Sequence, residues 1–255
     1  IAGIVTELAR ARTLLLLANT LAIAVSVTIA AVLIGLAAGW CIERCDLPGR
    51  RCWRVLASLP LAVPAFVASY AWASLGSAFE SMGGAILILT LSSYPLVFLP
   101  ASAAFRGMDP GFEEVSRSLG RGAWGTFFHA VIPQVRPALG VGALLVLTHM
   151  FAEFGALSLL RVQTFTTAIF ESYQLQFDSA SAALQSAVLV ALCLPAAYGE
   201  MQMRRRVRVS RVGRGSVRPV NPVPLGWTKW PVSLAFMALT LMSLGVPLST
   251  LVYWL

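Results

Sequence analysis

Long apolar stretches alternate with short polar segments along this 255-residue chain. Runs of about 20 apolar residues are long enough to cross a hydrocarbon core about 30 Å thick. The strands of a membrane β-barrel would instead be about ten residues long and would alternate apolar with polar positions. The pattern therefore predicts an all-α, polytopic membrane protein with about six spans, at residues 14–40, 55–74, 84–105, 137–160, 182–198 and 231–255.

Prolines and glycines modify these spans. Pro60 and Pro64 interrupt the second span, and Pro95 and Pro100 interrupt the third. A proline removes a backbone hydrogen bond and bends a helix, both in ordinary bundles and along transport pathways, so both interpretations stay open. In the first span, the small residues at both ends of segment 35–39 would allow close approach of a second helix.

Charge fixes the expected orientation. Charged residues make up only 12% of the chain, and 16 of the 19 Lys and Arg residues lie in three loops, at 41–54, 106–136 and 200–229. The positive-inside rule places these loops, including residues 109–133 and 200–229, in the cytosol and the N-terminus outside. The net charge of +8 is explained by this topology, so no nucleic-acid partner is expected.

The cysteines do not predict a disulfide framework or a metal site. Cys41, Cys45 and Cys52 lie around one cytosolic loop, where thiols stay reduced, and their spacing lacks a fourth zinc ligand. Cys193 lies in an apolar span. No bound metal, cofactor or catalytic residue is expected in this chain.

One polar and aromatic stretch, residues 109–133, separates two very apolar spans and predicts two short helices. Asp109 can cap the first helix, Pro110 suits its first position, and Gly120 offers a left-handed stop. Pro133 is expected to end the second helix. Apolar residues recur at helical spacing on both, at Phe112, Val115 and Leu119, then at Trp124, Phe127, Phe128, Val131 and Ile132. Two amphipathic helices joined by a bend predict a docking surface.

From Glu114 onward this stretch resembles the EAA loop of permease subunits of binding-protein-dependent ABC transporters, whose pattern is E-A-A-x3-G-x9-I-x-L-P. Glu114, Gly120 and Pro133 match in identity and spacing, whereas Val115 and Ser116 replace the two alanines. Ala130 and Ile132 stand at the isoleucine and leucine positions. Segments 59–72, 118–139 and 153–173 resemble the iron(III)-type branch, and the resemblance spans most of residues 14–200.

The resemblance implies a type I (MetI-like) importer permease in the bacterial inner membrane. It implies four kinds of partner: a dimer of cytosolic ATP-binding subunits, a periplasmic solute-binding protein, a second permease half or subunit, and the lipid bilayer. The solute would be ferric iron or another small solute. The chain has no G-x4-G-K-[ST] phosphate loop, so ATP and Mg²⁺ are expected on the partner subunit and no enzymatic activity is expected here.

Two groups of candidate site residues follow. The ATPase-coupling loop would use Glu113, Glu114, Arg117, Gly120, Trp124, Phe127 and Pro133, with Glu114 as the polar anchor. The translocation path would use His149, Glu153, Gln163 and Thr164. Glu153 is the only Asp, Glu, Lys or Arg within the predicted spans, and His149 precedes it by one helical turn. A His–Glu pair that holds helices together and an ordinary hydroxyl-rich loop remain the alternatives.

The expected organisation has three parts. Residues 1–200 would form the first permease repeat, with its opening helix missing. Residues 201–230 would be a basic cytosolic linker, and residues 231–255 the first helix of a second repeat.

Two other classes of function also fit the residues. An ion-coupled secondary transporter would use Glu153 and His149 as a proton relay, and a membrane scaffold would use the aromatic loop only to recruit a partner.

Overall fold

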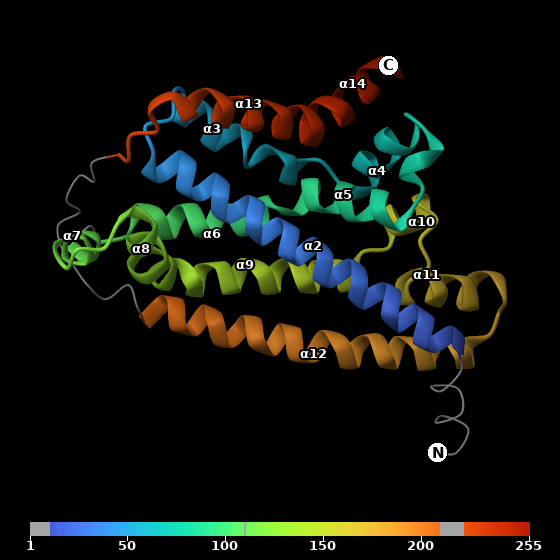
Figure 1. Cartoon of the computed structure of the whole chain (residues 1–255). Helices are drawn as coiled ribbons and strands as arrows, with labels where there is room; N and C mark the ends of the chain where they lie inside the picture. The colour runs from blue at the N-terminus through green and yellow to red at the C-terminus, as the bar shows by residue number, and fades with distance from the viewer. Residues whose placement is uncertain (1–10, 110, 210–221) are drawn as a thin grey trace.

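The computed structural model describes residues 11–109, 111–209 and 222–255, and these are helical apart from connecting loops and one isolated bridge between Cys45 and Val223. The predicted all-α class is confirmed. Figure 1 shows the elements, which are α2 (Ala11–Arg44), α3 (Arg50–Leu56), α4 (Ala65–Ala73), α5 (Met82–Ser93), α6 (Pro95–Arg106), α7 (Gly111–Ser118), α8 (Ala123–Thr126), α9 (Ile132–Ala152), α10 (Gly155–Leu159), α11 (Phe165–Phe170), α12 (Ser179–Val209), α13 (Lys229–Thr240) and α14 (Val246–Tyr253). Pro110 and most of the predicted linker lie outside the described residues.

Within the described residues, five helices are long and apolar enough to cross a membrane: Arg12–Arg44, Met82–Arg106, Ala123–Ala152, Ser179–Arg204 and Gly226–Tyr253. A sixth crossing is formed if the bent pair Arg50–Ala62 and Ala65–Ala73, which meet at 89°, counts as one broken span. The count of about six spans therefore agrees with the hydropathy pattern. The second span is bent where prolines were expected to bend it.

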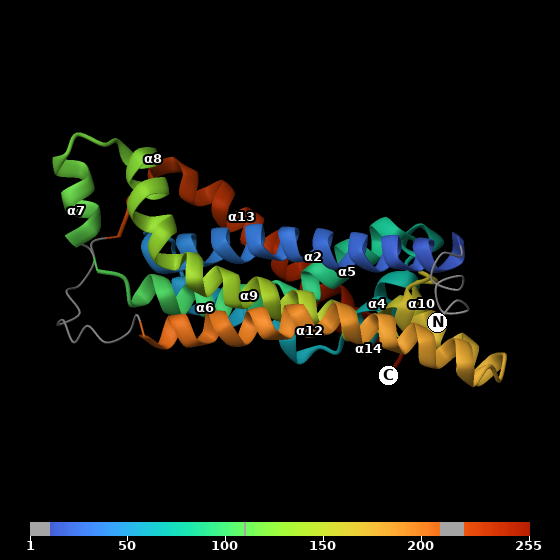
Figure 2. The ribbon, with the colours of Figure 1, turned by 90° about the horizontal axis from the view of Figure 1, so that it is seen from below.

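Helix α6 lies at the centre of the bundle, packed between α2 and α9 (Figures 1 and 2). A Cβ atom added to Gly35 of α2 would lie 2.8 Å from the Val97 Cβ of α6. A Cβ atom added to Gly142 of α9 would lie 2.7 Å from the Val97 Cα. Only glycine permits both approaches, so the predicted close packing at residues 35–39 is confirmed, and Gly142 adds a second close approach to Val97 from α9.

The fourth span differs from its predicted bounds of 137–160. The helix is continuous from Ala123 to Ala152 and ends there, because Glu153 adopts an extended backbone conformation (ψ 121°). The Glu153 carboxylate accepts a hydrogen bond from the Ala156 amide at 2.9 Å, and this bond starts the separate helix α10. Glu153 therefore lies at a helix end, not inside a span. A local side-chain bond to the backbone replaces the helical ladder at this point.

The described parts of the three basic loops lie at one end of the bundle, on the left in Figure 1. Helices α10 and α11, the start of α2 and the end of α14 lie at the other end. This arrangement agrees with alternating spans. The end with the three loops is called the basic end below, and the other is called the opposite end.

Candidate functional site

The predicted docking stretch stands at the tip of the basic end, with α7 projecting beyond the bundle (Figure 2). The Asp109 carboxylate accepts a hydrogen bond from the Gly111 amide at 2.9 Å, next to the first turn of α7. Gly120 has φ +78°, so the left-handed stop is confirmed. The apolar stripe of α7 faces outward, since Phe112, Val115 and Leu119 are all exposed. The apolar stripe of α7 is therefore not part of the core, and exposed apolar stripes of this kind are typical of interaction surfaces.

The second arm of the stretch divides its aromatic residues between the bundle and the outside. Phe127 and Val131 pack inward, and the Phe127 ring lies 4.9 Å from the Trp40 ring of α2. Trp124 is 76% exposed, and its ring stacks on exposed Phe128 at a centroid distance of 6.2 Å. The exposed apolar residues of both arms form what is called the coupling surface below: Phe112, Val115, Leu119, Trp124 and Phe128.

The expectation that Pro133 ends the second arm is wrong. Residues Phe127–Val131 form a π-helical turn, and the chain continues from it directly into α9 with Pro133 in the first turn. Proline removes one amide donor from a helix, and here this irregularity coincides with the π-helical turn directly before it. The second arm is therefore an extension of the fourth span at the basic end, continuous with α9.

The two adjacent carboxylates of α7 have different surroundings. Glu113 is buried and forms an ion pair with Arg44 at the end of α2. Glu114 is exposed, and the described part of the chain provides no ion pair for it. Arg117 is exposed as well. Glu113 thus binds the loop to its own bundle, whereas Glu114 and Arg117 are free to meet a partner.

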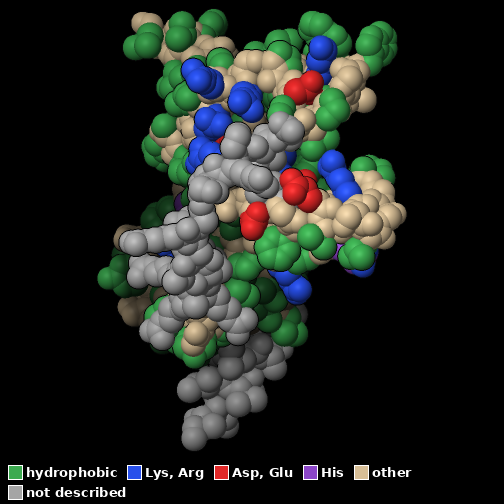
Figure 3. Space-filling view, turned by 90° about the vertical axis from the view of Figure 1, so that its left-hand side faces the viewer, with side chains coloured by type: hydrophobic (Ala, Val, Ile, Leu, Met, Phe, Trp, Pro, Cys, Tyr) green, Lys and Arg blue, Asp and Glu red, His purple; other side chains and the backbone are tan. Residues whose placement is uncertain are grey.

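A second ion-pair cluster at the basic end was not predicted from the sequence. Arg54 of α3 donates two hydrogen bonds to the Glu43 carboxylate, at 2.8 and 2.7 Å. The Ser102 hydroxyl of α6 donates another at 2.6 Å, and Arg106 lies at 3.8 Å. Figure 3 shows Lys and Arg side chains gathered at this end of the molecule. The sequence signal was the loop arginines, which we interpreted only as markers of topology.

At the opposite half of the bundle, a pocket of about 360 Å³ lies where two spans are broken. Its lining includes Pro64 before α4 and Phe66 in its first turn. His149 of α9, and Glu153 and Phe154 directly after it, line the other side. His149 Nε2 and Glu153 Oε2 are 3.8 Å apart, which is too long for a hydrogen bond. The structure thus brings two of the four predicted pathway residues together in one pocket.

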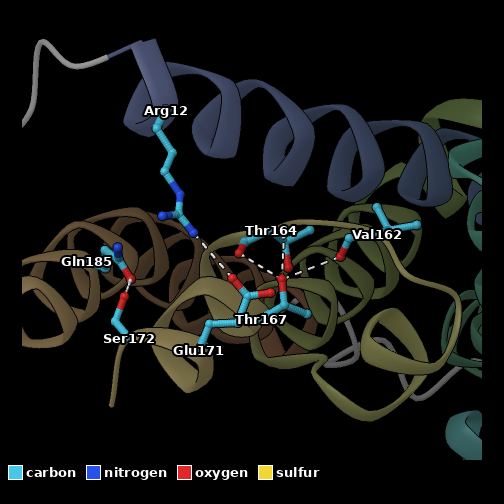
Figure 4. Close-up of polar contacts among 7 residues, drawn as sticks. All are labelled: Arg12, Val162, Thr164, Thr167, Glu171, Ser172 and Gln185. Atoms are coloured by element: carbon cyan, nitrogen blue, oxygen red, sulfur yellow. Dashed lines mark hydrogen bonds and ion pairs between the residues drawn. The ribbon is translucent and has the colours of Figure 1, made fainter. Parts of the chain in front are cut away.

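The other two predicted pathway residues lie outside this pocket. Thr164 is buried and caps α11, since its backbone amide donates to the Thr167 hydroxyl at 2.8 Å (Figure 4). Gln163 is exposed, and its carbonyl accepts a hydrogen bond from Asn19 at 3.0 Å. Nearby, Arg12 and Glu171 form an exposed ion pair at 3.2 Å (Figure 4). Thr164 therefore has a local structural role at this end.

The cysteines at the basic end are free thiols. Hydrogen bonding with Cys41, together with burial, raises the pKa of the Cys45 thiol, which keeps this thiol protonated at neutral pH. Within residues 11–109, 111–209 and 222–255, no group of three or more His, Cys, Asp or Glu residues is placed to hold a metal ion.

The bundle and its projecting loop define a multi-span helical membrane protein. The family described as "Binding-protein-dependent transport system inner membrane component" matches residues 31–209, so the chain belongs to that family. This confirms the family resemblance carried by Glu114, Gly120 and Pro133.

The chain is also similar to individual transport permeases. The chain is 42% identical over 241 residues to the Fe(3+)-transport system permease protein FbpB 2 of Haemophilus influenzae, covering 94% of this chain and 48% of that protein. It is 30% identical over 139 residues to the molybdenum transport system permease protein ModB of Escherichia coli, covering 48% of this chain and 60% of that protein. The chain therefore spans about half of the length of its FbpB relative.

A solved structure supports the fold. An inward-facing structure of the MetNI methionine ABC transporter is similar with a TM-score of 0.58 at 19% sequence identity. The similarity covers 78% of this chain and 98% of that chain. The MetI-like permease fold is thus confirmed by a neighbour of low sequence identity.

Proposed function

We propose that this chain is part of an ATP-binding-cassette importer permease that carries ferric iron across the bacterial inner membrane by alternating access. Membership in the binding-protein-dependent family supports the class, and the FbpB relative, whose name states Fe(3+) transport, supports the solute. The observation that carries the proposal is the coupling surface, five apolar side chains exposed on a loop beyond the bundle. Such a surface needs a partner to cover it.

The partner at the coupling surface is a cytosolic ATP-binding subunit, which holds ATP and Mg²⁺ and performs the hydrolysis. The stacked Trp124 and Phe128 rings provide the apolar contact, and exposed Glu114 and Arg117 provide charges at its edge. The basic end then lies in the cytosol, in line with the positive-inside rule. The opposite end receives a periplasmic solute-binding protein.

The solute passes through a pathway shared with a second permease half. Residues 1–200 act as the first repeat, the basic residues 201–230 as a linker, and residues 231–255 as the first helix of the second repeat. The pocket at the two broken spans belongs to this pathway, since transporters place solute sites at discontinuous helices. Carboxylate and imidazole groups bind iron, so Glu153 and His149 would contact the ion in transit. Gln163 lies nearer the outer mouth.

Neither rival function gains support. Membership in a binding-protein-dependent family favours an importer over a free-standing scaffold or secondary transporter. The separation of 3.8 Å between His149 Nε2 and Glu153 Oε2 is also too long for direct proton transfer.

The proposed function is tested by placing a charge in the apolar coupling surface and by reversing the charge at its edge. The full-length permease is reconstituted in proteoliposomes with its ATPase subunit and binding protein, and ATP-dependent uptake of ⁵⁵Fe is measured. Trp124→Glu and Glu114→Lys should lower uptake at least about tenfold, by loss of the apolar contact and of its edge charge. Both proteins should remain in the membrane.

Arg51→Glu is the control. Arg51 is exposed at the same end, but it lies in α3 and outside residues 109–133. This variant should transport like the wild type. Normal uptake by Trp124→Glu, or uptake by the wild type driven by a proton gradient without ATP, would contradict the proposal.

A further inference from the structure

The last turn of α2 presents two side chains to the coupling loop. Trp40 and Arg44 are four residues apart and therefore share one face of the helix. The Trp40 ring lies 4.9 Å from the Phe127 ring of the second arm and 5.7 Å from the Phe105 ring of α6. The Arg44 guanidinium lies 5.9 Å from the Trp40 ring centroid, at cation–π distance.

Arg44 extends this contact to the first arm. Its guanidinium is bound by the Glu113 carboxylate of α7, and the two side chains are only 2% and 10% exposed. The Arg44 Nε and Nη1 atoms are buried without a hydrogen-bond partner among the described residues. Glu113 is thus the acidic group that compensates this buried charge. Removing either partner leaves the other charge buried and uncompensated, which makes the contact hard to break.

One helical turn therefore holds both arms of the coupling loop. Trp40 packs on the second arm, Arg44 binds the first, and the arms bond to each other where the Ser116 hydroxyl donates to Thr126 at 3.3 Å. The contact with Phe105 adds the end of α6 to the same cluster. The loop and the ends of α2 and α6 are consequently one packed unit.

The end of α2 also contacts the segment that leads into α13. The Arg44 carbonyl accepts a hydrogen bond from the Val223 amide at 2.8 Å, and the Asp46 carboxylate accepts one from the Leu225 amide at 2.7 Å. The residue that binds the coupling loop through its side chain thus binds the entry to the last span through its backbone. A movement of α7 reaches both places through the end of α2.

We propose that Arg44 and Trp40 are positioning residues of the transport cycle, which make the coupling loop move as one body with α2, α6 and the entry to α13. The inference rests on the proposed function, because it assigns to these residues the transmission of movement from an ATPase. Arg44 is a residue of the loop that we had interpreted only as a topology marker. Glu113, rather than its exposed neighbour Glu114, is its partner.

A structural measurement tests the clamp without any transport assay. The full-length permease is placed in lipid nanodiscs, and amide hydrogen exchange of residues 111–118 is followed by mass spectrometry. Arg44→Ala and the isosteric Glu113→Gln should each raise exchange there at least about tenfold, because α7 loses its attachment. The charge-swapped pair R44E/E113R should return most of the protection.

The matched control is Arg54→Ala, which removes a half-exposed cation from the buried Glu43 carboxylate at the same end of α2. Its exchange at residues 111–118 should equal that of the wild type. Unchanged exchange in both Arg44→Ala and Glu113→Gln would overturn the clamp. Equal increases in Glu113→Gln and Arg54→Ala would overturn it too, because the effect would then be general loosening of the basic end.

A second measurement asks whether the clamp transmits movement. In proteoliposomes with the ATPase subunit and binding protein, Glu113→Gln and Trp40→Ala should raise the ATP hydrolysed per iron imported by about fivefold or more, and R44E/E113R should lower it again. Arg54→Ala should keep the wild-type ratio. A wild-type ratio in Glu113→Gln and Trp40→Ala would overturn the positioning role. Absence of ATP-dependent uptake by the wild type would instead contradict the proposed function, and the exchange result would still stand.

Discussion

The ion-pair clusters that join the end of α2 to α7 and to α3 and α6, at the basic end, each contain a buried carboxylate, whereas the ion pairs at the opposite end are largely exposed. The pairs Arg44–Glu113 and Glu43–Ser102 join residues 69 and 59 positions apart. At the opposite end, Arg12 of the pair with Glu171 is 52% exposed, and the bond between Thr164 and Thr167 spans three residues. The comparison teaches that buried charges fix the ion pairs of one end, while the ion pairs of the other end are open to water.

This difference suits the two tasks that we propose for the ends. A loop that receives movement from an ATPase transmits it only if it is fixed to the spans. A mouth that opens toward a binding protein must instead change shape at low cost in free energy. Exposed ion pairs allow this, because water replaces either partner readily.

The largest expected effect tests the buried side of the comparison. Arg54→Ala leaves the Glu43 carboxylate, whose side chain is 2% exposed, with the Ser102 hydroxyl as its one near partner and Arg106 at 3.8 Å. Breaking a buried pair from one side should lower the free energy of unfolding by about 2–4 kcal/mol. Denaturation with SDS in mixed micelles measures it. A loss below about 1 kcal/mol would show that water reaches Glu43.

An intermediate effect is expected at the pocket. Glu153→Ala removes the acceptor for the Ala156 amide at the start of α10. Loss of such a cap should cost about 1 kcal/mol, and Glu153→Gln should retain most of the stability, since its amide oxygen still accepts the bond. The same SDS titration compares the two variants. Equal losses in both would mean that charge, and not capping, stabilises this turn.

The smallest effect tests the exposed side of the comparison. Arg12→Ala breaks the ion pair with Glu171 at the opposite end, and the loss should be below about 1 kcal/mol and should shrink as salt is added. Unfolding titrations of wild type and variant at low and high ionic strength provide the measurement. A loss as large as that of Arg54→Ala would remove the distinction between the two ends.

Local signals were sufficient for part of this architecture. The cap at Asp109, the left-handed turn at Gly120 and the outward stripe of α7 each depend on residues within a few positions of one another. The bend at Pro60 and Pro64 is local as well. The six apolar runs predicted the crossings because lipid demands the same composition wherever a helix lies in the bundle.

The long-range contacts could not be predicted from the sequence. Glu113 and Glu114 are adjacent and chemically alike, and only the position of Arg44 decides which of them is buried. The end of α9 at Glu153 was missed because the apolar pattern continues beyond it, although the carboxylate three residues before Ala156 was a capping signal. The predicted helix end at Pro133 was wrong because the π-helical turn that precedes it has no reliable sequence signal.

Helix α2 is 34 residues long and contains no proline. Near its start, the Thr20 hydroxyl accepts a hydrogen bond from the Phe165 amide, and at its end Arg44 binds the coupling loop. These two attachment points are 24 residues apart, or about 36 Å at 1.5 Å per residue. An unbroken rod of this length acts as a lever, so a tilt of about 5° at one end displaces the other by about 3 Å. This proline-free helix thereby gives the two ends a direct connection that bypasses the proline-bent spans.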